Sequence, residues 1–221
     1  MTSTSLPVYI GVSPQQRKHE TTSGEYVRIK NEVFYKISHY DSMEPFFMSL
    51  VSSSNHWMFI SSTGGLSAGR VNADHALFPY YTVDKITENS EGTGAKTLLL
   101  VKREGKAFLW EPFSVRLIGI YSIERNLYKN ISGSALIFEE TNLSLGLTFR
   151  YGWRTGDRFG FIKNSTLRND TPDACTVEVL DGLQNLLAAN ISSQTQNVFS
   201  PLLDGYKRNE LDEKTGLGIF T

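Results

Sequence analysis

The sequence of 221 residues has a single cysteine and no long apolar run. Cys175 cannot form an internal disulfide, and it lies in an alternating apolar stretch that suits a small buried side chain. No apolar stretch approaches the roughly 20 residues that a membrane helix needs. The first residues also lack the basic and apolar regions of a secretory signal. We therefore expect no membrane segment and a cytoplasmic location.

An excess of charge of either sign is also missing, because 22 Lys and Arg residues face 23 Asp and Glu residues. No basic block stands out that could neutralise a run of phosphates, so nucleic acid is not an expected partner. The four histidines are His19, His39, His56 and His75, and their spacing matches no compact metal motif. The sequence therefore predicts no metal site and no cofactor.

Apolar residues, in contrast, are abundant: 40% of the chain is hydrophobic and 12% is aromatic, enough to bury a core. The length fits one domain. We expect a single domain over 1–221, with a poorly structured leader over 1–23 and the start of a linker within 191–221. Residues 215–221 have the pattern of a strand without a closing turn, which fits a cut inside a longer polypeptide.

The apolar residues recur at a period close to two in most segments, which is the pattern of strands. Turn-forming residues interrupt these segments about every 10 to 15 residues. This spacing predicts an all-β fold, an antiparallel β-supersandwich. The segments with the strand pattern are 26–29, 33–37, 46–51, 57–60, 98–101, 107–110, 115–122, 127–130, 135–139, 143–151, 159–167 and 176–180.

One short helix is expected over 181–190. Asp181 is a suitable N-cap, and three leucines, Leu183, Leu186 and Leu187, fall on one side of the helix. The Ser, Gln and Asn residues of 191–197 then predict a loop.

Two glycine-rich segments match catalytic patterns only in part. Residues 65–69 match the G-x-S-x-G turn of serine esterases, but His75 is the only histidine after Ser67 and follows it too closely to be the base. We interpret this segment as a loop that needs positive φ angles. Residues 92–97 resemble a phosphate loop, yet Ala95 stands in place of the expected glycine and a strand pattern follows. A hairpin turn is the better interpretation.

The segment 63–81 is too polar and glycine-rich for a core, and it ends in aromatic residues. Binding residues concentrate in loops carried by a rigid sheet. Its polar side chains suit sugar hydroxyls, and flat aromatic rings suit the face of a pyranose. Trp153 is surrounded by turn residues and charges, which favours an exposed ring. The predicted carbohydrate-binding residues are Arg70, Asp74, His75, Tyr80 and Trp153.

Several phrases of the sequence together resemble a known family. They are the Gly64-Gly65 loop followed by Asp74 and the aromatic run to Tyr81, then 122–125, 136–140, and 167–171 leading into 177–183. In this combination the chain resembles, over about 24–187, the N-terminal β-supersandwich of large carbohydrate-active enzymes. These include cellobiose-phosphorylase-like and glucoamylase-like proteins, and the domain has a galactose mutarotase-like fold.

The resemblance implies a module that carries no catalytic carboxylate and packs on a following (α/α)6 barrel. A glycine-rich loop of such a module approaches the entrance of the active site, and the matching positions here are Gly64, Gly65, Arg70 and Asp74. The chain has no barrel pattern, so neither hydrolysis nor phosphorolysis is expected of it alone. The apolar surface that a barrel would cover can also drive self-association into a homo-oligomer.

Two alternatives stay open. A histidine paired with a distant glutamate can perform acid–base chemistry on a sugar ring. His75 with Glu111 or Glu139 would then make the chain a free-standing aldose epimerase-like enzyme, which requires both side chains in one concave pocket. The other alternative is an interaction domain without sugar contact, with every tryptophan in the core.

Overall fold

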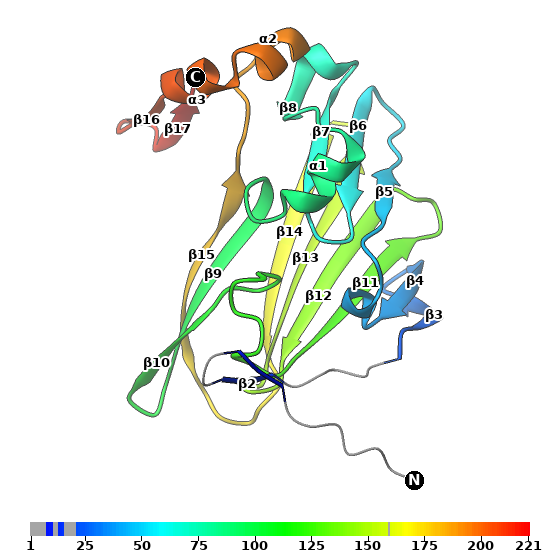
Figure 1. Ribbon diagram of the computed structural model, residues 1–221, viewed down its shortest axis with the longest axis vertical. Coiled ribbons are helices and arrows are strands. Elements are labelled where there is room, and N and C mark those ends of the chain that lie inside the picture. Colours follow the sequence, from blue (N-terminus) through cyan, green and yellow to red (C-terminus); the bar gives the residue numbers. More distant parts are fainter. Residues whose placement is uncertain (1–7, 11–12, 16–20, 159) are drawn as a thin grey trace.

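The structure is a computed structural model that describes residues 8–10, 13–15, 21–158 and 160–221 (Figure 1). The strands are β1 (Val8–Ile10), β2 (Ser13–Gln15), β3 (Ser23–Ile29), β4 (Glu32–Ser38), β5 (Phe47–Leu50), β6 (His56–Ser61), β7 (Leu66–Arg70), β8 (Ala76–Phe78), β9 (Gly94–Arg103), β10 (Lys106–Trp110), β11 (Ile123–Asn130), β12 (Ala135–Asn142), β13 (Leu147–Gly156), β14 (Gly160–Asn169), β15 (Thr176–Gln184), β16 (Asn209–Asp212) and β17 (Leu217–Phe220). The α-helices are α1 (Val83–Glu88), α2 (Ser193–Val198) and α3 (Ser200–Tyr206). Short 3-10 turns lie at Tyr40–Ser42 and Ala73–His75.

Antiparallel sheets make up most of the molecule, as the alternating pattern predicts. The largest sheet has the strand order β14-β13-β12-β11-β4-β3. Two smaller sheets, β5-β6-β7-β8 and β10-β9-β15, contribute side chains to the same apolar core as this sheet. Figure 1 shows the long strands β11 to β14 in the middle, with β9, β10 and β15 on one side. The all-β antiparallel sandwich is therefore confirmed. The predicted leader over 1–23 lies largely outside the described residues.

The core follows from the period of two along the central strands. On β13, Leu147, Phe149, Tyr151 and Trp153 are all buried and point to one face. They meet buried residues of the smaller sheets, such as Ile60 on β6. Each large apolar side chain that is fully buried stabilises the fold by roughly 1.5–3 kcal/mol relative to exposure.

The predicted helix over 181–190 is wrong. Its first four residues belong to β15, which pairs with β9 in a register from Thr176 opposite Lys102 to Gln184 opposite Gly94. Asp181 caps no helix; its carboxylate accepts hydrogen bonds from Thr97 Oγ1 at 2.6 Å and from Lys163 Nζ at 2.7 Å. Backbone pairing with the distant strand β9 therefore stabilises this segment more than its short helical pattern does.

The loop predicted over 191–197 is also wrong, because most of it forms α2. Ser192 begins this helix, and its hydroxyl accepts a hydrogen bond from the Thr195 backbone N–H at 3.1 Å. A serine in that position is a preferred N-cap, so the same polar residues that indicate a loop can start a helix. A proline in the first turn, Pro201, then helps to begin α3. The range 191–221 thus contains both helices and the β16–β17 hairpin.

The strand predicted over 115–122 is a series of turns instead. Its backbone donors bond locally, as from Ile118 N to Val115 O and from Ile120 N to Leu117 O, or to the Glu91 carboxylate at 2.7 Å from Val115 N. Because these groups have local partners, the segment leaves the sheets and forms one wall of a cavity described below.

The described part of the chain contains no helix with the length and apolar character that a bilayer crossing requires.

Candidate functional site

The G-x-S-x-G segment is structural. Ser67 is fully buried on β7, and its hydroxyl donates to the Pro79 carbonyl at 2.7 Å, so it cannot act as a nucleophile. The interpretation of 65–69 as a loop that needs positive φ angles is wrong, because residues 66–70 form β7 and neither Gly65 nor Gly69 has a positive φ. The positive φ, +95°, is at Gly64 in the preceding turn, in the region that favours glycine. A Cβ on Gly65 would lie 2.0 Å from the Ile86 carbonyl oxygen of α1. The glycines therefore allow the β6–β7 turn to pack closely against α1.

Two of the five predicted sugar-binding residues, Arg70 and His75, line one surface pocket of about 770 Å³. Arg70 ends β7, and His75 lies in the 3-10 turn that follows. The same pocket is lined by His56 from β6, Phe161 from β14 and residues of 187–190, so four segments of the chain form it. The chain proximity of Arg70 and His75 and the β6–β7 pairing, which sets His56 opposite Arg70, explain this grouping.

The polar groups of this Arg70/His75 pocket form hydrogen bonds with neighbouring side chains. Arg70 Nε donates to Asn55 Oδ1 at 3.4 Å, and Asn72 Oδ1 lies 2.9 Å from His75 Nδ1. His56 Nδ1 lies 2.5 Å from the Ser54 hydroxyl. A cation, two imidazoles and amide oxygens beside the Phe161 ring can bind the hydroxyls and the apolar face of a sugar.

Burial lowers the pKa of His56 below its usual value of 6.5, and the nearby Arg70 cation lowers it further. The imidazole is therefore neutral at pH 7 and can accept as well as donate a hydrogen bond. Its ring meets Phe161 edge-on, with ring centroids 5.3 Å apart.

This arrangement predicts a measurable titration. We expect NMR to show His56 titrating below 6.5. Arg70→Gln should move that pKa upward only in part, because the burial of the ring remains. Arg168→Gln, on an arginine paired with Asp170 and outside the pocket, is the control and should leave the His56 pKa unchanged. An Arg70→Gln variant with an unaltered His56 pKa would show that the two groups do not interact.

Asp74 and Tyr80 lie outside this pocket and link the loop to α2. The Asp74 carboxylate accepts hydrogen bonds from the backbone N–H and the hydroxyl of Ser193, each at 2.7 Å, and these bonds lower its pKa. The Tyr80 backbone N–H donates to Gln196 Oε1 at 3.0 Å, while its ring meets Trp57 edge-on at 5.5 Å. These two residues position the segment 72–81.

Trp153 is not an exposed sugar platform, contrary to the prediction. The residue lies within β13, opposite Leu136 and Lys163, and only 2% of it is exposed. Its ring packs against Phe78 at 6.4 Å. The turn residues and charges that follow it mark the end of the strand, not the surroundings of the ring.

The structure does not bring His75 together with either candidate glutamate. Glu111 is buried and pairs with Lys96 and Arg116. Glu139 accepts hydrogen bonds from Asn126, Tyr128 and Arg150. Neither glutamate lines the Arg70/His75 pocket. The geometry that the epimerase hypothesis requires is therefore absent from the described residues.

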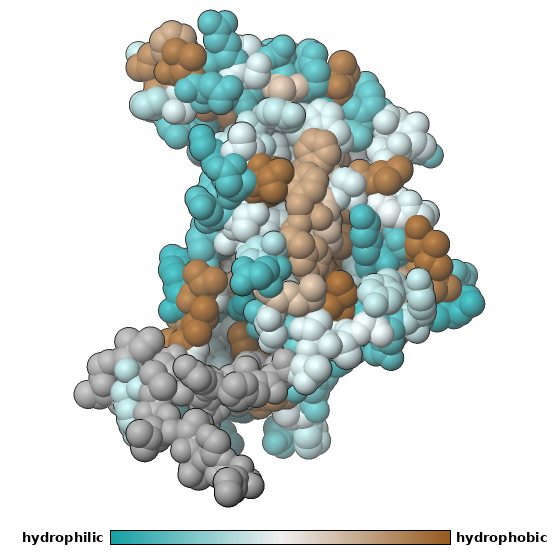
Figure 2. All heavy atoms as spheres, turned by 45° about the vertical axis from the view of Figure 1, so that its right-hand side comes forward, coloured by the Kyte–Doolittle hydropathy of each residue, from teal (hydrophilic) through white to brown (hydrophobic). Residues whose placement is uncertain are grey.

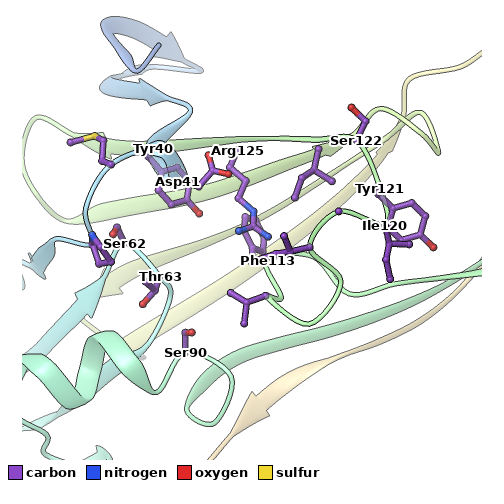
Figure 3. Close-up of a pocket in the computed structure, with 16 residues that line it drawn as sticks. Tyr40, Asp41, Ser62, Thr63, Ser90, Phe113, Ile120, Tyr121, Ser122 and Arg125 are labelled. Atoms are coloured by element: carbon purple, nitrogen blue, oxygen red, sulfur yellow. The ribbon is translucent and has the colours of Figure 1, made fainter. Parts of the chain in front are cut away.

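A second cavity, of about 700 Å³, was not anticipated from the sequence (Figure 3). Its lining residues come from 40–45, from the β6–β7 turn, from Ser90 after α1, and from 113–125. Arg125 reaches it from β11, where Nε donates to Glu140 Oε2 at 2.7 Å and Nη2 donates to the Ser114 carbonyl at 3.2 Å. Burial alone would lower the pKa of Arg125, but the adjacent Glu140 raises it above its usual value. Two apolar strands each carry a charged residue at a position that faces inward, Arg125 on β11 and Glu140 on β12. This pattern in the sequence could have revealed the cavity.

No protein-family model matches the chain, and a search of curated proteins finds no significantly similar sequence. The fold and the two cavities therefore define an antiparallel β-sandwich protein with cavities of mixed polar and apolar lining, and the family resemblance of the sequence stays a prediction.

Proposed function

We propose that this chain is a non-catalytic β-sandwich module of a carbohydrate-processing protein, of the glycoside hydrolase-like or phosphorylase-like class. In this proposal it packs on a catalytic domain and borders that domain's sugar site with the Arg70/His75 pocket. The proposal assigns no catalytic residue, metal or cofactor to the chain and places it in the cytoplasm. The observation that carries it is an exposed apolar surface over α2, α3 and the β16–β17 hairpin.

This apolar surface has the character of an uncovered interface. Monomeric proteins rarely expose large contiguous apolar patches unless a partner covers them. Figure 2 shows brown spheres gathered at the upper left, at the end of the molecule that carries α3 and β16. The side chains concerned, each at least 46% exposed, are Val198, Phe199, Leu202, Tyr206, Leu211, Leu217 and Ile219.

The apolar surface and the Arg70/His75 pocket are linked directly. The Asp74 carboxylate binds Ser193 at the start of α2, and Asn190, which precedes that helix, lines the pocket. A domain that covered α2 and α3 would therefore lie next to Arg70 and His75. This adjacency supports the second half of the proposal, that the module borders a sugar site.

The test compares amide hydrogen exchange in two proteins: this 221-residue chain alone, and the full polypeptide of which the proposal makes it a part. We expect the amides of α3 and β17 to exchange at least about tenfold more slowly in the full polypeptide, because a packed domain suppresses local opening. Amides at the tip of the β9–β10 hairpin, which lies at the opposite, lower end of the molecule in Figure 1, are the internal control and should be unchanged.

Equal exchange of α3 and β17 in both proteins would contradict the packing. A polypeptide that contains no further domain would contradict the module itself. Protection that rises with the concentration of the chain alone would instead identify a second copy as the partner.

A further inference from the structure

The cavity beside Arg125 contains two polar groups that the protein itself leaves unpaired. Tyr40 is 6% exposed and Arg125 is 9% exposed. Within the described residues, neither the Tyr40 hydroxyl nor Arg125 Nη1 has a hydrogen-bond partner, although Nε and Nη2 of the same guanidinium do. Neither atom is among the fully buried side-chain atoms that lack a partner, so both face the open cavity, where they can bind water or a ligand.

These two groups act together. The Arg125 charge influences the Tyr40 phenol, and Figure 3 shows the hydroxyl and the guanidinium next to each other above Phe113. Burial raises the pKa of Tyr40 above its usual value, so the hydroxyl keeps its proton and can donate. Both groups therefore offer hydrogen-bond donors to an oxygen atom of a ligand.

The opposite requirement, an acceptor for ligand hydroxyls, is met by Asp41. Its side chain lines the same cavity, as do the hydroxyls of Thr63 and Ser90. Thr63 Oγ1 donates to the Thr87 carbonyl at 2.9 Å and lies 2.9 Å from the Ser61 hydroxyl, which leaves one lone pair to accept from a ligand. A ligand that carries both donors and acceptors thus finds partners for each.

The remaining wall is apolar and partly fixed. Ile118 and Ile120 stand on the turns of 115–122 and line the cavity, although they are 58% and 64% exposed. The Tyr121 ring is held by its hydroxyl, which donates to the Leu109 carbonyl at 2.6 Å. Such a wall suits the C–H face of a sugar ring.

Charge decides between a neutral and an anionic ligand. The Arg125 cation is already balanced by Glu140, with 2.7 Å between Nε and Oε2. The Asp41 carboxylate lies near both Tyr40 and Arg125 without a salt-bridge partner among the described residues. A second anion in this cavity would be repelled by Asp41, so a neutral molecule fits better.

We propose that this cavity binds a neutral carbohydrate, held by the Tyr40 hydroxyl, Arg125 Nη1 and the Asp41 carboxylate against the Ile120 side of the wall. Its volume of about 700 Å³ lies within the range typical of small-molecule sites. No residue lines both this cavity and the Arg70/His75 pocket, so the two are separate sites. The proposal deepens the proposed function, whose ligand class it shares, but it needs no partner domain.

The experiment measures binding of cellobiose, a neutral disaccharide, to the 221-residue chain by titration calorimetry and NMR. We expect saturable binding at millimolar concentration, with chemical shift changes at Tyr40 and Asp41. Tyr40→Phe should weaken it roughly three- to tenfold, which is the value of one hydrogen bond. This variant removes only the unpaired hydroxyl and keeps the ring against Phe138, so it should fold normally. Tyr35→Phe, on a phenol outside the cavity, is the matched control and should bind as the unaltered chain does.

Three outcomes would overturn the proposal: no saturable binding of cellobiose, tighter binding of the anionic sugar glucuronate, or cellobiose binding that Tyr40→Phe leaves unchanged while Arg70→Gln abolishes it. The last result would place the sugar in the other pocket. Binding here and protection of α3 by a partner domain are measured separately, so either proposal can fail while the other holds.

Discussion

Replacing Glu140 by glutamine is expected to lower the free energy of unfolding by about 3–5 kcal/mol, the cost of leaving a buried charge without its partner. Glu140 is 1% exposed, and its two oxygens accept hydrogen bonds from Trp110 Nε1, the Phe113 backbone N–H and Arg125 Nε. A glutamine would present an NH2 group to one of these donors and leave Arg125 uncompensated. Urea unfolding followed by tryptophan fluorescence measures the change.

The matched control is Glu178→Gln. Glu178 also pairs with a cation, Lys102, but both side chains are about half exposed or more, so the expected loss is at most about 1 kcal/mol. If Glu140→Gln were as mild as this control, the buried network would not stabilise the fold. Since Glu140 also holds Phe113, the variant should in addition speed amide exchange in 113–122.

Trp153→Ala is expected to lower the free energy of unfolding by about 3–5 kcal/mol, the usual cost of truncating a large buried aromatic side chain. The ring is 2% exposed and packs against Phe78 inside the main core. Its removal leaves a cavity that the close-packed sheets cannot fill. Denaturant unfolding again gives the measurement.

Tyr80→Ala is the comparison for this prediction. Tyr80 is also an aromatic residue of the predicted sugar site, but it is 47% exposed, so its truncation should cost far less than that of Trp153. A Trp153→Ala variant as stable as the unaltered chain would favour the exposed platform predicted from the sequence over the buried ring.

Hairpins could be predicted from the sequence because neighbouring residues decide them. The β9–β10 turn has φ values of 51° at Glu104 and 71° at Gly105, the geometry that tight hairpins use. The apolar alternation on both sides of this turn then sets the register, which places Trp110 opposite Leu99. Nothing outside this short segment is needed to specify it.

The segments that sequence patterns misplaced depend on distant partners. Residues 181–184 join a strand because β9 offers an open edge to them. Residues 115–122 have strand-like alternation but bond to themselves and to Glu91. The local sequence pattern limits the structures that a segment can form. The strand or side chain that is available to pair with it determines which of them it adopts.

The two pockets also differ in whether their residues are close together in the sequence. Arg70 and His75 are close in the chain, so a sequence pattern could predict that they act together. Tyr40 and Arg125 are far apart, and only the packing of the Tyr40 turn against β11 brings them into one cavity.

By itself, the sequence determined the class of fold, since alternation between two faces makes sheets the only way to bury this many apolar side chains. It also determined the tight turns and the local cluster at 70–75. The tertiary structure decided which strands pair, that Trp153 lies inside, and that Arg125 faces a cavity, because each of these depends on the free energy of contacts between distant segments.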